Sequence, residues 1–473
     1  MFRFFRDFLI YGMASMMGKI VAVLLMPVYT NILTKEEYGA MALITSVQGI
    51  IGLVSNLNIH SGIARDYYEK GIDRTQLVST GFFSILTLSL FIMCASLLTR
   101  SFLGGKVLGL KEYFIPAFTV MLINIPAGSL MSYFAVLTRY KKKPVQYSIG
   151  TILQLVIQIG ISVIGVVVMR AGIISVFVGI LVGELFALCY FAILNREYIG
   201  LQFNKELLYR ALSFALPTLP AILAGWLDSS MGQILIGKYV SVEDLGVYSI
   251  ALSLASVFTL ISMAFNNVWS PYLFENYNQP WFKQSIRNLF GIIALTLVLI
   301  TILLSVFSRE IVLLLSNEGY LDACRYVTLL CIPMSFYLLF PFASSGVSIT
   351  RDTKYIGIAY IAGSCGNLLL LFVSIRYLGV VAVPLCLAVS RIMSYFILYK
   401  VSEKKVGFKL PNYILLLLVL FVALGYYIVT LQLPFWIRGL ITFLLVSSLF
   451  LYVYNRYDIK GMWIKLRFLI SKK

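Results

Sequence analysis

Apolar residues follow one another along this chain in long runs that contain almost no charge and are separated by short polar loops. Fourteen runs are long enough to cross a membrane: 8–33, 39–63, 77–99, 113–138, 146–169, 173–194, 211–237, 245–270, 287–307, 323–348, 355–375, 380–399, 411–430 and 435–455. About 20 helical residues span a hydrocarbon core of about 30 Å, whereas strands of a membrane barrel alternate apolar and polar residues over about 10. The pattern therefore predicts an all-α polytopic membrane protein with 14 transmembrane helices.

The composition agrees with this class. Of the 473 residues, 60% are hydrophobic and 12% are charged, and the mean hydropathy is +0.91. A soluble globular domain carries about 25% charged residues. Arg3 and Arg6 precede the first run, but that run is too long for a signal peptide and lacks a small-x-small cleavage site. We therefore expect it to be retained as the first span.

Lysine and arginine are divided unevenly between alternate loops. With the N-terminus in the cytoplasm, that side receives 26 of them and the opposite side 10, counting those at the ends of runs, while Lys19 and Arg391 lie deep inside runs. The positive-inside rule then predicts a plasma (inner) membrane protein with both termini cytoplasmic. The chain has no basic domain outside the predicted spans that would account for the net charge of +18. This charge predicts attraction to anionic membrane lipids and not binding of nucleic acid.

Residues suited to metal binding or covalent catalysis are scarce. The six cysteines form no CxxC pair, and His60 is the only histidine. Neither a metal site, a disulfide framework nor a catalytic triad can be assembled from this set. We expect a protein without a cofactor that is not an enzyme.

A repeat organises the chain. The segment Thr34-Lys-Glu-Glu-Tyr-Gly39 returns 207 residues later as Ser241-Val-Glu-Asp-Leu-Gly246, and each reads as a capping box that opens a helix. Further matches pair Leu137-Thr-Arg139 and Lys142 with Ile349-Thr-Arg351 and Lys354 at an offset of 212, and Arg170 and Gly172 with Arg376 and Gly379. The repeat predicts two parallel lobes, 1–200 and 201–405, followed by helices 13 and 14 with a basic tail in 406–473. Chance similarity between apolar helices is the alternative.

Four charged residues lie deep inside the runs, where each costs about 2.5–3.5 kcal/mol on insertion scales. Lys19 in the first run and Asp228 in the seventh occupy nearly equivalent places, and Glu184 and Arg391 in the sixth and twelfth are 207 residues apart. Opposite charges at matching places predict a central polar path between the two halves. The alternatives are that Glu184 and Arg391 pair to orient helices and that Lys19 extends to the interface.

Polar residues recur every three or four positions along run 39–63, as Thr45, Gln48, Gly52, Asn56 and His60. Run 245–270 shows a similar stripe of Ser249, Ser253, Ser256 and Asn267. We predict that Asn56, His60 and Asn267 line a cavity, although such stripes also form helix contacts. Arg65 follows run 39–63, and we predict that it lies near the cytoplasmic mouth of the cavity. Pro217 and Pro220 predict a kink or break in the helix before Asp228.

The segment Pro27-Val-Tyr-Thr-Asn-Ile-Leu-Thr-Lys-Glu-Glu-Tyr-Gly39 and the later Arg65-Asp-Tyr-Tyr-Glu69 resemble motifs of the Wzx-like polysaccharide flippases. These belong to the multidrug/oligosaccharidyl-lipid/polysaccharide exporter (MOP) superfamily. The resemblance covers the whole chain in span number and duplication, but strong local similarity is confined to about the first 70 residues and the copy near 241. It implies two six-helix lobes that form a V around a cationic cavity in the bacterial inner membrane.

The resemblance further implies translocation of undecaprenyl-pyrophosphate-linked oligosaccharide to the outer leaflet. Lys19, Arg65 and Arg391 would attract the pyrophosphate, and Asp228 or Glu184 would take up a proton or sodium, or the membrane potential would drive the cycle. A polysaccharide polymerase and glycosyltransferases are the expected partners. One alternative is a cation-coupled exporter of small organic molecules. Another is a membrane-embedded polysaccharide polymerase or acyltransferase, for which the loops are too short.

Overall fold

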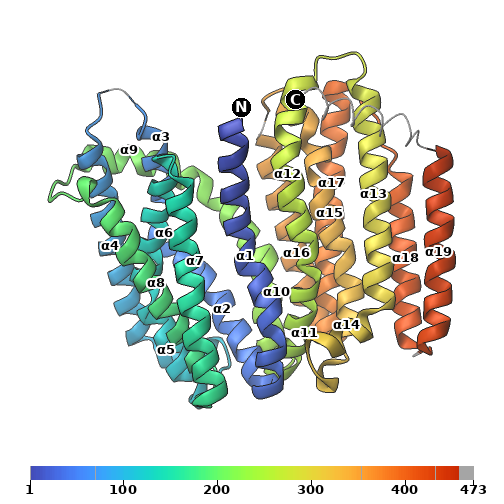
Figure 1. Cartoon of the computed structure of the whole chain (residues 1–473), viewed down its shortest axis with the longest axis horizontal. Helices are drawn as coiled ribbons and strands as arrows, with labels where there is room; N and C mark the ends of the chain where they lie inside the picture. Colours follow the sequence, from blue (N-terminus) through green and yellow to red (C-terminus); the bar gives the residue numbers. More distant parts are fainter. Residues whose placement is uncertain (1, 70, 353, 432, 457–473) are drawn as a thin grey trace. The chain divides into compact units, whose positions relative to one another are not determined.

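The structure is a computed structural model that describes residues 2–69, 71–352, 354–431 and 433–456. Side chains are described for 16–69, 71–266, 268–352, 354–431 and 433–448. The described part consists of helices joined by short loops and contains no strand (Figure 1). The basic tail beyond 456, which the sequence analysis assigned to the cytoplasm, lies outside the described residues.

The chain packs into two compact units. Unit 1 consists of Met1–Ser253, Leu315–Gly319 and Ser364–Val383, and unit 2 of Leu254–Leu314, Tyr320–Gly363 and Pro384–Lys473. The boundaries between the two units fall inside some helices, because the units are separated by how the chain packs in space and not by helix ends. The lobes 1–200 and 201–405 follow the sequence repeat and stay a prediction.

Unit 1 contains the first eleven α-helices. They are α1 (Phe2–Ile32), α2 (Lys35–Asn56), α3 (Ile59–Asp66), α4 (Arg74–Leu98), α5 (Ile115–Ile123), α6 (Ile125–Tyr140), α7 (Pro144–Val163), α8 (Ile174–Leu194), α9 (Lys205–Ala215), α10 (Leu219–Tyr239) and most of α11 (Val242–Ala255). Short π or 3-10 turns connect them: η1 (Phe102–Val107), η2 (Glu112–Phe114), η3 (Ile164–Val168), η4 (Arg196–Tyr198) and η5 (Leu216–Thr218). Figure 1 shows α4, α6, α7 and α8 running side by side.

Unit 2 is built around the pair α13 and α15. Its helices are α12 (Val257–Asn276), α13 (Phe282–Val306), α14 (Ser308–Leu315), α15 (Ala323–Ile349), α18 (Tyr413–Thr430) and α19 (Phe435–Arg456). The turn η6 (Glu318–Tyr320) precedes α15. Helices α16 (Lys354–Leu378) and α17 (Ala382–Val406), joined by η7 (Gly379–Val381), are shared between the units. A continuous apolar core packs α13 and α15 against α12 and α18.

Every one of the predicted apolar runs overlaps helix. Eleven helical segments of the described chain are long and apolar enough to cross a membrane, one of which, Lys354–Val406, covers two predicted runs. The apolar helices Met16–Ile32 and Phe435–Ser448 are shorter. The structure is that of a multi-pass membrane protein, and the number 14 stays a prediction.

The capping box predicted at Thr34 is confirmed, and at Ser241 the capping hydrogen bond of the serine hydroxyl is present. The Thr34 hydroxyl accepts a hydrogen bond from the Glu37 N–H at 3.2 Å, and the Glu37 carboxylate accepts one from the Thr34 N–H at 2.9 Å. In the second copy the Ser241 hydroxyl accepts from the Asp244 N–H at 2.9 Å and donates to its carboxylate at 2.7 Å. The repeat therefore holds at the level of side-chain hydrogen bonds.

The match after the fourth span needs a correction. Lys142 and Arg351 both adopt left-handed backbone, with φ of 55° and 61°. The N–H of Lys143 bonds the carbonyl of Thr138, and that of Asp352 bonds the carbonyl of Val347, so the two helix ends superpose at an offset of 209 and not 212. The offset of 212 aligns Arg139 with Arg351 by residue type alone. The left-handed residue that ends the helix lies three positions after Arg139 in the first copy and at Arg351 itself in the second.

Two other elements depart from straight helices. The predicted run 39–63 breaks after Asn56, because Leu57 and Asn58 adopt left-handed backbone with φ of 46° and 54°. His60 therefore lies in the first turn of a new helix, α3, and the proposed single polar stripe through Asn56 and His60 is wrong. The kink predicted at Pro217 and Pro220 is confirmed: the turn η5 separates α9 from α10, and Figure 1 shows the two helices running in different directions.

Candidate functional site

Lys19 lies in α1 as predicted, on a helix that packs against α7. It is half-buried. The neighbouring Gly18 faces Leu155 of α7, since a Cβ there would lie 3.8 Å from the Leu155 side chain. The lysine therefore stands on an apolar helix that packs against another helix of unit 1.

Asp228 of α10 is buried and accepts a hydrogen bond from the amide of Asn367 of α16, with 3.0 Å between Nδ2 and Oδ1. The two helices also touch through Ser364, whose hydroxyl donates to the carbonyl of Ala224 at 3.0 Å. The Oδ1 atom of Asn367 is buried and accepts no hydrogen bond within the described residues. The Asp228 carboxylate and the amide oxygen of Asn367 thus belong to neighbouring buried side chains in unit 1.

Glu184 of α8 has a similar partner. The Asn124 amide donates to its carboxylate over 2.8 Å, and Asn124 sits where α5 ends and α6 begins with Pro126. Gly128 of α6 makes room for the carboxylate, because a Cβ there would lie 2.5 Å from Glu184 Oε2. Asn124 therefore forms an interhelical hydrogen bond, and Glu184 pairs with an amide.

The two carboxylate–amide pairs share one chemical feature. Like Asn367, Asn124 is almost fully buried and its Oδ1 atom has no hydrogen-bond partner in the described chain. An orphaned amide oxygen beside a carboxylate offers oxygen ligands to a monovalent cation or an acceptor to a carboxylic acid proton. No group of three or more His, Cys, Asp or Glu side chains that could hold a metal ion occurs within the described ranges.

Arg391 of α17 is held between aromatic rings in unit 2. Its guanidinium lies 5.2 Å from the ring centroid of Tyr337 on α15 and 5.7 Å from that of Tyr360 on α16. Cation–π attraction of this kind stabilises a guanidinium without neutralising its charge. The three helices therefore fix a positive charge at membrane depth.

Arg65 and His60 lie together on the short helix α3. The Arg65 guanidinium is exposed and lies 5.1 Å from the ring centroid of Phe214 on α9. Helix α3 is tied to α9 by Arg210, whose Nε lies 3.1 Å from the Asp66 carboxylate and which also bonds Glu69. The hydrogen bond from Arg210 lowers the pKa of the Glu69 carboxyl below its ordinary value.

Asn56 caps the break between α2 and α3. Its Oδ1 accepts from the Asn58 N–H at 2.8 Å, and the Asn58 amide in turn donates to the Thr218 hydroxyl in η5 at 2.9 Å. The break in one helix is thus bonded to the break in another. The side chain of Asn267, the remaining predicted cavity residue, lies outside the described residues.

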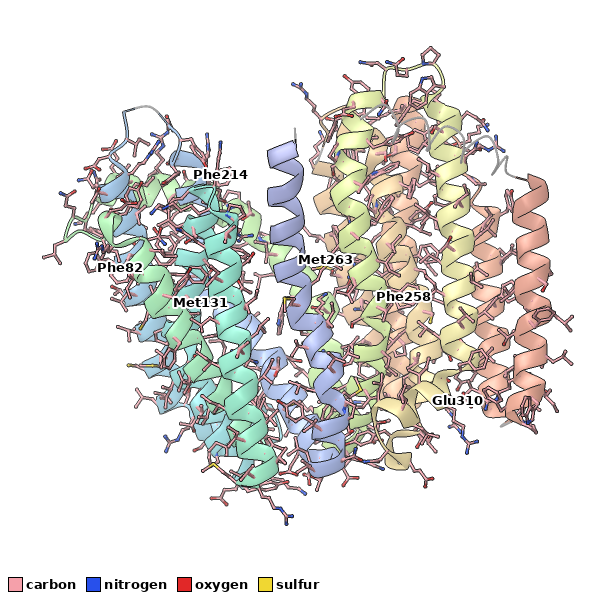
Figure 2. All side chains as sticks on the ribbon, viewed as in Figure 1. Phe82, Met131, Phe214, Phe258, Met263 and Glu310 are labelled. Carbon is pink, nitrogen blue, oxygen red and sulfur yellow. The ribbon has the colours of Figure 1, made fainter. Side chains whose placement is uncertain are left out.

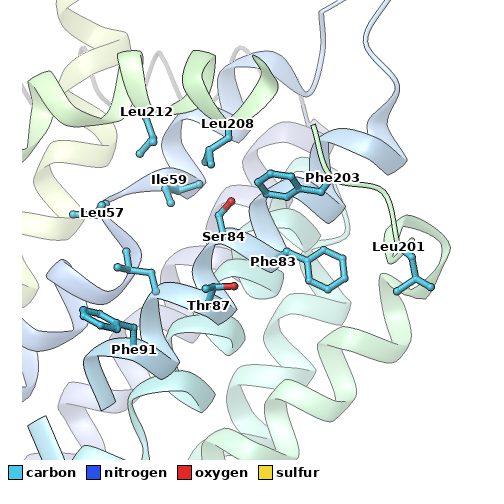
Figure 3. Close-up of a pocket in the computed structure, with 11 residues that line it drawn as sticks. Leu57, Ile59, Phe83, Ser84, Thr87, Phe91, Leu201, Phe203, Leu208 and Leu212 are labelled. Atoms are coloured by element: carbon cyan, nitrogen blue, oxygen red, sulfur yellow. The ribbon is translucent and has the colours of Figure 1, made fainter. Parts of the chain in front are cut away.

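An apolar groove of about 690 Å³ runs between α4 and α9 in unit 1 (Figure 3). Its lining includes Phe83 and Phe91 of α4 and Leu208 and Leu212 of α9. Only Ser84 and Thr87 add hydroxyl groups. Its size and lining suit a hydrocarbon chain.

Three residues of these sites were missed by the sequence analysis. Asn367 is a lone amide before four leucines, a signal comparable to that of Asp228. Tyr337 and Tyr360 carry no such signal, because tyrosines are common throughout the chain and only their packing shows which of them face a cation.

A sequence model of the family described as polysaccharide biosynthesis protein matches residues 28–325. No curated protein sequence matches the chain.

Several solved structures share the fold. The lipid II flippase MurJ in its inward closed conformation aligns with a TM-score of 0.69 at 15% identity, covering 95% of this chain and 100% of that chain. An inward-facing multidrug resistance MATE family transporter of the MOP superfamily gives 0.68 at 14% identity, covering 80% and 92%. A MOP superfamily transporter from Pyrococcus furiosus Vc1, described as having reverse polarity of its binding pocket, gives 0.56 at 14% identity, covering 85% and 95%. The predicted class of an all-α polytopic membrane protein is confirmed, while the number of 14 helices stays a prediction.

Proposed function

Because the chain belongs to the polysaccharide biosynthesis protein family, we propose that it is a flippase for undecaprenyl-pyrophosphate-linked oligosaccharides. It would carry this lipid from the cytoplasmic to the outer leaflet of the bacterial inner membrane. A pyrophosphate and a glycan cannot cross hydrocarbon unaided, since burying an unpaired charge costs many kcal/mol. The protein must therefore supply fixed positive charge inside the membrane.

The observation that carries the proposal is Arg391 between Tyr337 and Tyr360. A ring contact leaves the charge of a guanidinium in place, and arginine binds phosphate oxygens in bidentate fashion. Lys19 supplies a second cation on an apolar helix, and exposed Arg65 supplies a third near the cytoplasmic mouth predicted by the loop charges.

Coupling to an ion gradient is assigned to Asp228, with Glu184 as the second candidate. The support is geometric: each carboxylate has a buried amide neighbour with an oxygen left free. Proton or sodium uptake would neutralise the carboxylate and change the balance between two packings of its helices. Rocking of one half against the other would then alternate access.

The lipid tail needs no polar site. The groove between α4 and α9 gives an isoprenoid chain an apolar path along unit 1. A polysaccharide polymerase and glycosyltransferases would act on the same lipid-linked glycan before or after transport.

The second candidate is a cation-coupled exporter of small organic molecules. Lysine at position 19 and arginine at position 391 oppose an organic cation as cargo, because like charges repel strongly in a medium of low dielectric constant.

Reconstituted vesicles with a fluorescent polyprenyl-pyrophosphate glycan in one leaflet test the proposal. We expect Lys19→Ala and Arg391→Gln to slow translocation at least about tenfold, the effect of losing one charge-assisted contact of about 1.5 kcal/mol. Arg100→Gln, at an exposed loop arginine, is the matched control. Unchanged rates in both test variants would remove these cations from the mechanism, and transport of organic cations without glycan transport would favour the exporter.

A further inference from the structure

A second cavity, of about 130 Å³, lies in unit 2 where α13 and α18 end and α15 and α19 begin. Three of the side chains that line it are arginines: Arg309 of α14, Arg325 of α15 and Arg438 of α19. Asp322 is the only acidic residue in its lining. The apolar part of the wall comes from the end of α18 and the loop that follows it, through Val429 and Leu433.

Arg438 forms the fixed side of this cavity. It is 7% exposed and pairs with Glu310, with 3.0 Å between Nη1 and Oε2. It also donates from Nη1 to the Val306 carbonyl and from Nε to the Leu433 carbonyl, both at 2.9 Å. These bonds tie the start of α19 to the end of α13, and Figure 2 labels Glu310 at this place.

Arg309 and Arg325 form the open side. Both are exposed, and neither has an ion-pair partner within the described residues. Arg309 lies in the first turn of α14 and Arg325 in the first turn of α15. The N-terminus of each helix carries a partial positive charge, which strengthens the positive potential around the two guanidinium groups. The cavity is therefore cationic on two sides, and Glu310 is already engaged by Arg438.

The depth of the cavity fits the membrane interface. α13 ends at Val306, α15 begins at Ala323 and α19 begins at Phe435, so the hydrocarbon region stops at this level. Phe435 and Trp436 are exposed beside Arg438, at 49% and 82%. Aromatic residues of this kind concentrate at lipid headgroup level. By the charges of the loops, this end faces the outer leaflet.

We propose that this cavity binds the phosphate of an anionic phospholipid headgroup. Arg309 and Arg325 grip the phosphate oxygens, Arg438 closes the inner wall, and the acyl chains lie against α18 and α19. A cavity of this volume accommodates one phosphate group and excludes a bulky glycan. The lipid would fasten the last two helices to the rest of unit 2.

The test uses the purified full-length chain and native mass spectrometry, which counts bound lipids. Phosphatidylglycerol is the probe, and zwitterionic phosphatidylcholine is the reference lipid. We expect the wild-type chain to retain phosphatidylglycerol, and the double variant Arg309→Gln/Arg325→Gln to bind it at least about tenfold more weakly. The matched control is Arg100→Gln, which leaves binding unchanged. Thermal unfolding of each variant in detergent establishes that it is folded.

Competition with inorganic phosphate separates a headgroup from the free ion. Displacement of phosphatidylglycerol only by other anionic lipids supports the lipid site. Displacement by inorganic phosphate at millimolar concentration would show that the cavity selects free phosphate and would overturn the lipid assignment. Equal phosphatidylglycerol binding by wild type and double variant would overturn the site itself. None of these results depends on glycan transport, so the flippase proposal stands or falls separately.

Discussion

Gly39 and Gly246, equivalent residues of the repeat, pack directly against each other in unit 1. A Cβ on Gly39 would lie 1.8 Å from the carbonyl oxygen of Val242, and a Cβ on Gly246 would lie 2.2 Å from that of Lys35. Val242 is itself the repeat equivalent of Lys35, 207 residues later. The contact is therefore reciprocal, as in a symmetric dimer interface. The sequence repeat is expressed as a twofold crossing of α2 and α11.

Replacing either glycine by alanine should destabilise the protein. The new methyl group meets backbone, which cannot rotate away, so the helices must separate at a cost of about 1–3 kcal/mol. Thermal unfolding followed by tryptophan fluorescence measures the loss. Gly52→Ala is the control, because a Cβ at Gly52 on the same helix meets nothing within 4 Å.

The reciprocal crossing also predicts how the two changes combine. Once Gly39→Ala has separated α2 from α11, Gly246→Ala finds the space already open, so the double variant should lose less than the sum of the single losses. Additive losses, or a Gly39→Ala variant as stable as Gly52→Ala, would contradict the crossing.

Asp228→Asn should remove the coupling to an ion gradient. The new amide oxygen can still accept the bond from Asn367, but the residue can no longer take up a proton or balance a cation. We expect glycan translocation in vesicles to become insensitive to imposed proton and sodium gradients. The neighbouring exposed Ser229→Ala is the control. Gradient dependence that survives in Asp228→Asn would transfer the role to Glu184.

Glu184→Gln should leave the protein as stable as wild type or more stable. No basic side chain pairs with Glu184 in the described chain, and glutamine keeps the bond from Asn124 while removing a charge at membrane depth. Glu184→Ala should instead cost about 1–3 kcal/mol, because it leaves the buried Asn124 amide without an acceptor. A glutamine variant that unfolds as early as the alanine variant would show that the charge itself is needed for folding.

Arg391→Lys should not rescue translocation to the wild-type rate. Lysine keeps the charge but loses the planar guanidinium that stacks on Tyr337 and Tyr360 and binds phosphate in bidentate fashion. We expect binding of the pyrophosphate glycan to weaken at least about tenfold, measured by titration in detergent. Tyr337→Phe, which keeps the ring, should bind nearly as wild type. Full activity of the lysine variant would mean that charge alone matters.

Acid should loosen the attachment of α19. Burial raises the pKa of the Glu310 carboxyl, but the hydrogen bonds from Arg438 and from its own backbone lower that pKa by more than burial raises it. The pKa therefore lies below the usual 4.5. The pair therefore contributes stability above that value and loses it as the pH falls through the lowered pKa. Glu310→Gln should remove this part of the acid sensitivity of unfolding. Unfolding scans between pH 3 and 7 measure it, because this range brackets the ordinary glutamate pKa of about 4. An unchanged pH profile would exclude this pair.

Several features of the fold could be derived from the residues alone. Long uncharged runs have one outcome in lipid, because every backbone polar group must be bonded within its own helix. The capping hydrogen bonds at Thr34 and Ser241 depend on residues three positions apart, so they form wherever the helix starts. The break at Pro217 has the same local origin.

The sequence by itself thus determined the helical membrane class, the repeat and the presence of charges at membrane depth. Only the tertiary structure decided that Asn367 faces Asp228, that Asn124 faces Glu184 and that two tyrosines hold Arg391. Such partners are separated by 31–139 residues, and their meeting depends on how each helix is rotated about its own axis. That rotation is set by close packing with neighbouring helices, and no periodicity within a single apolar helix specifies it.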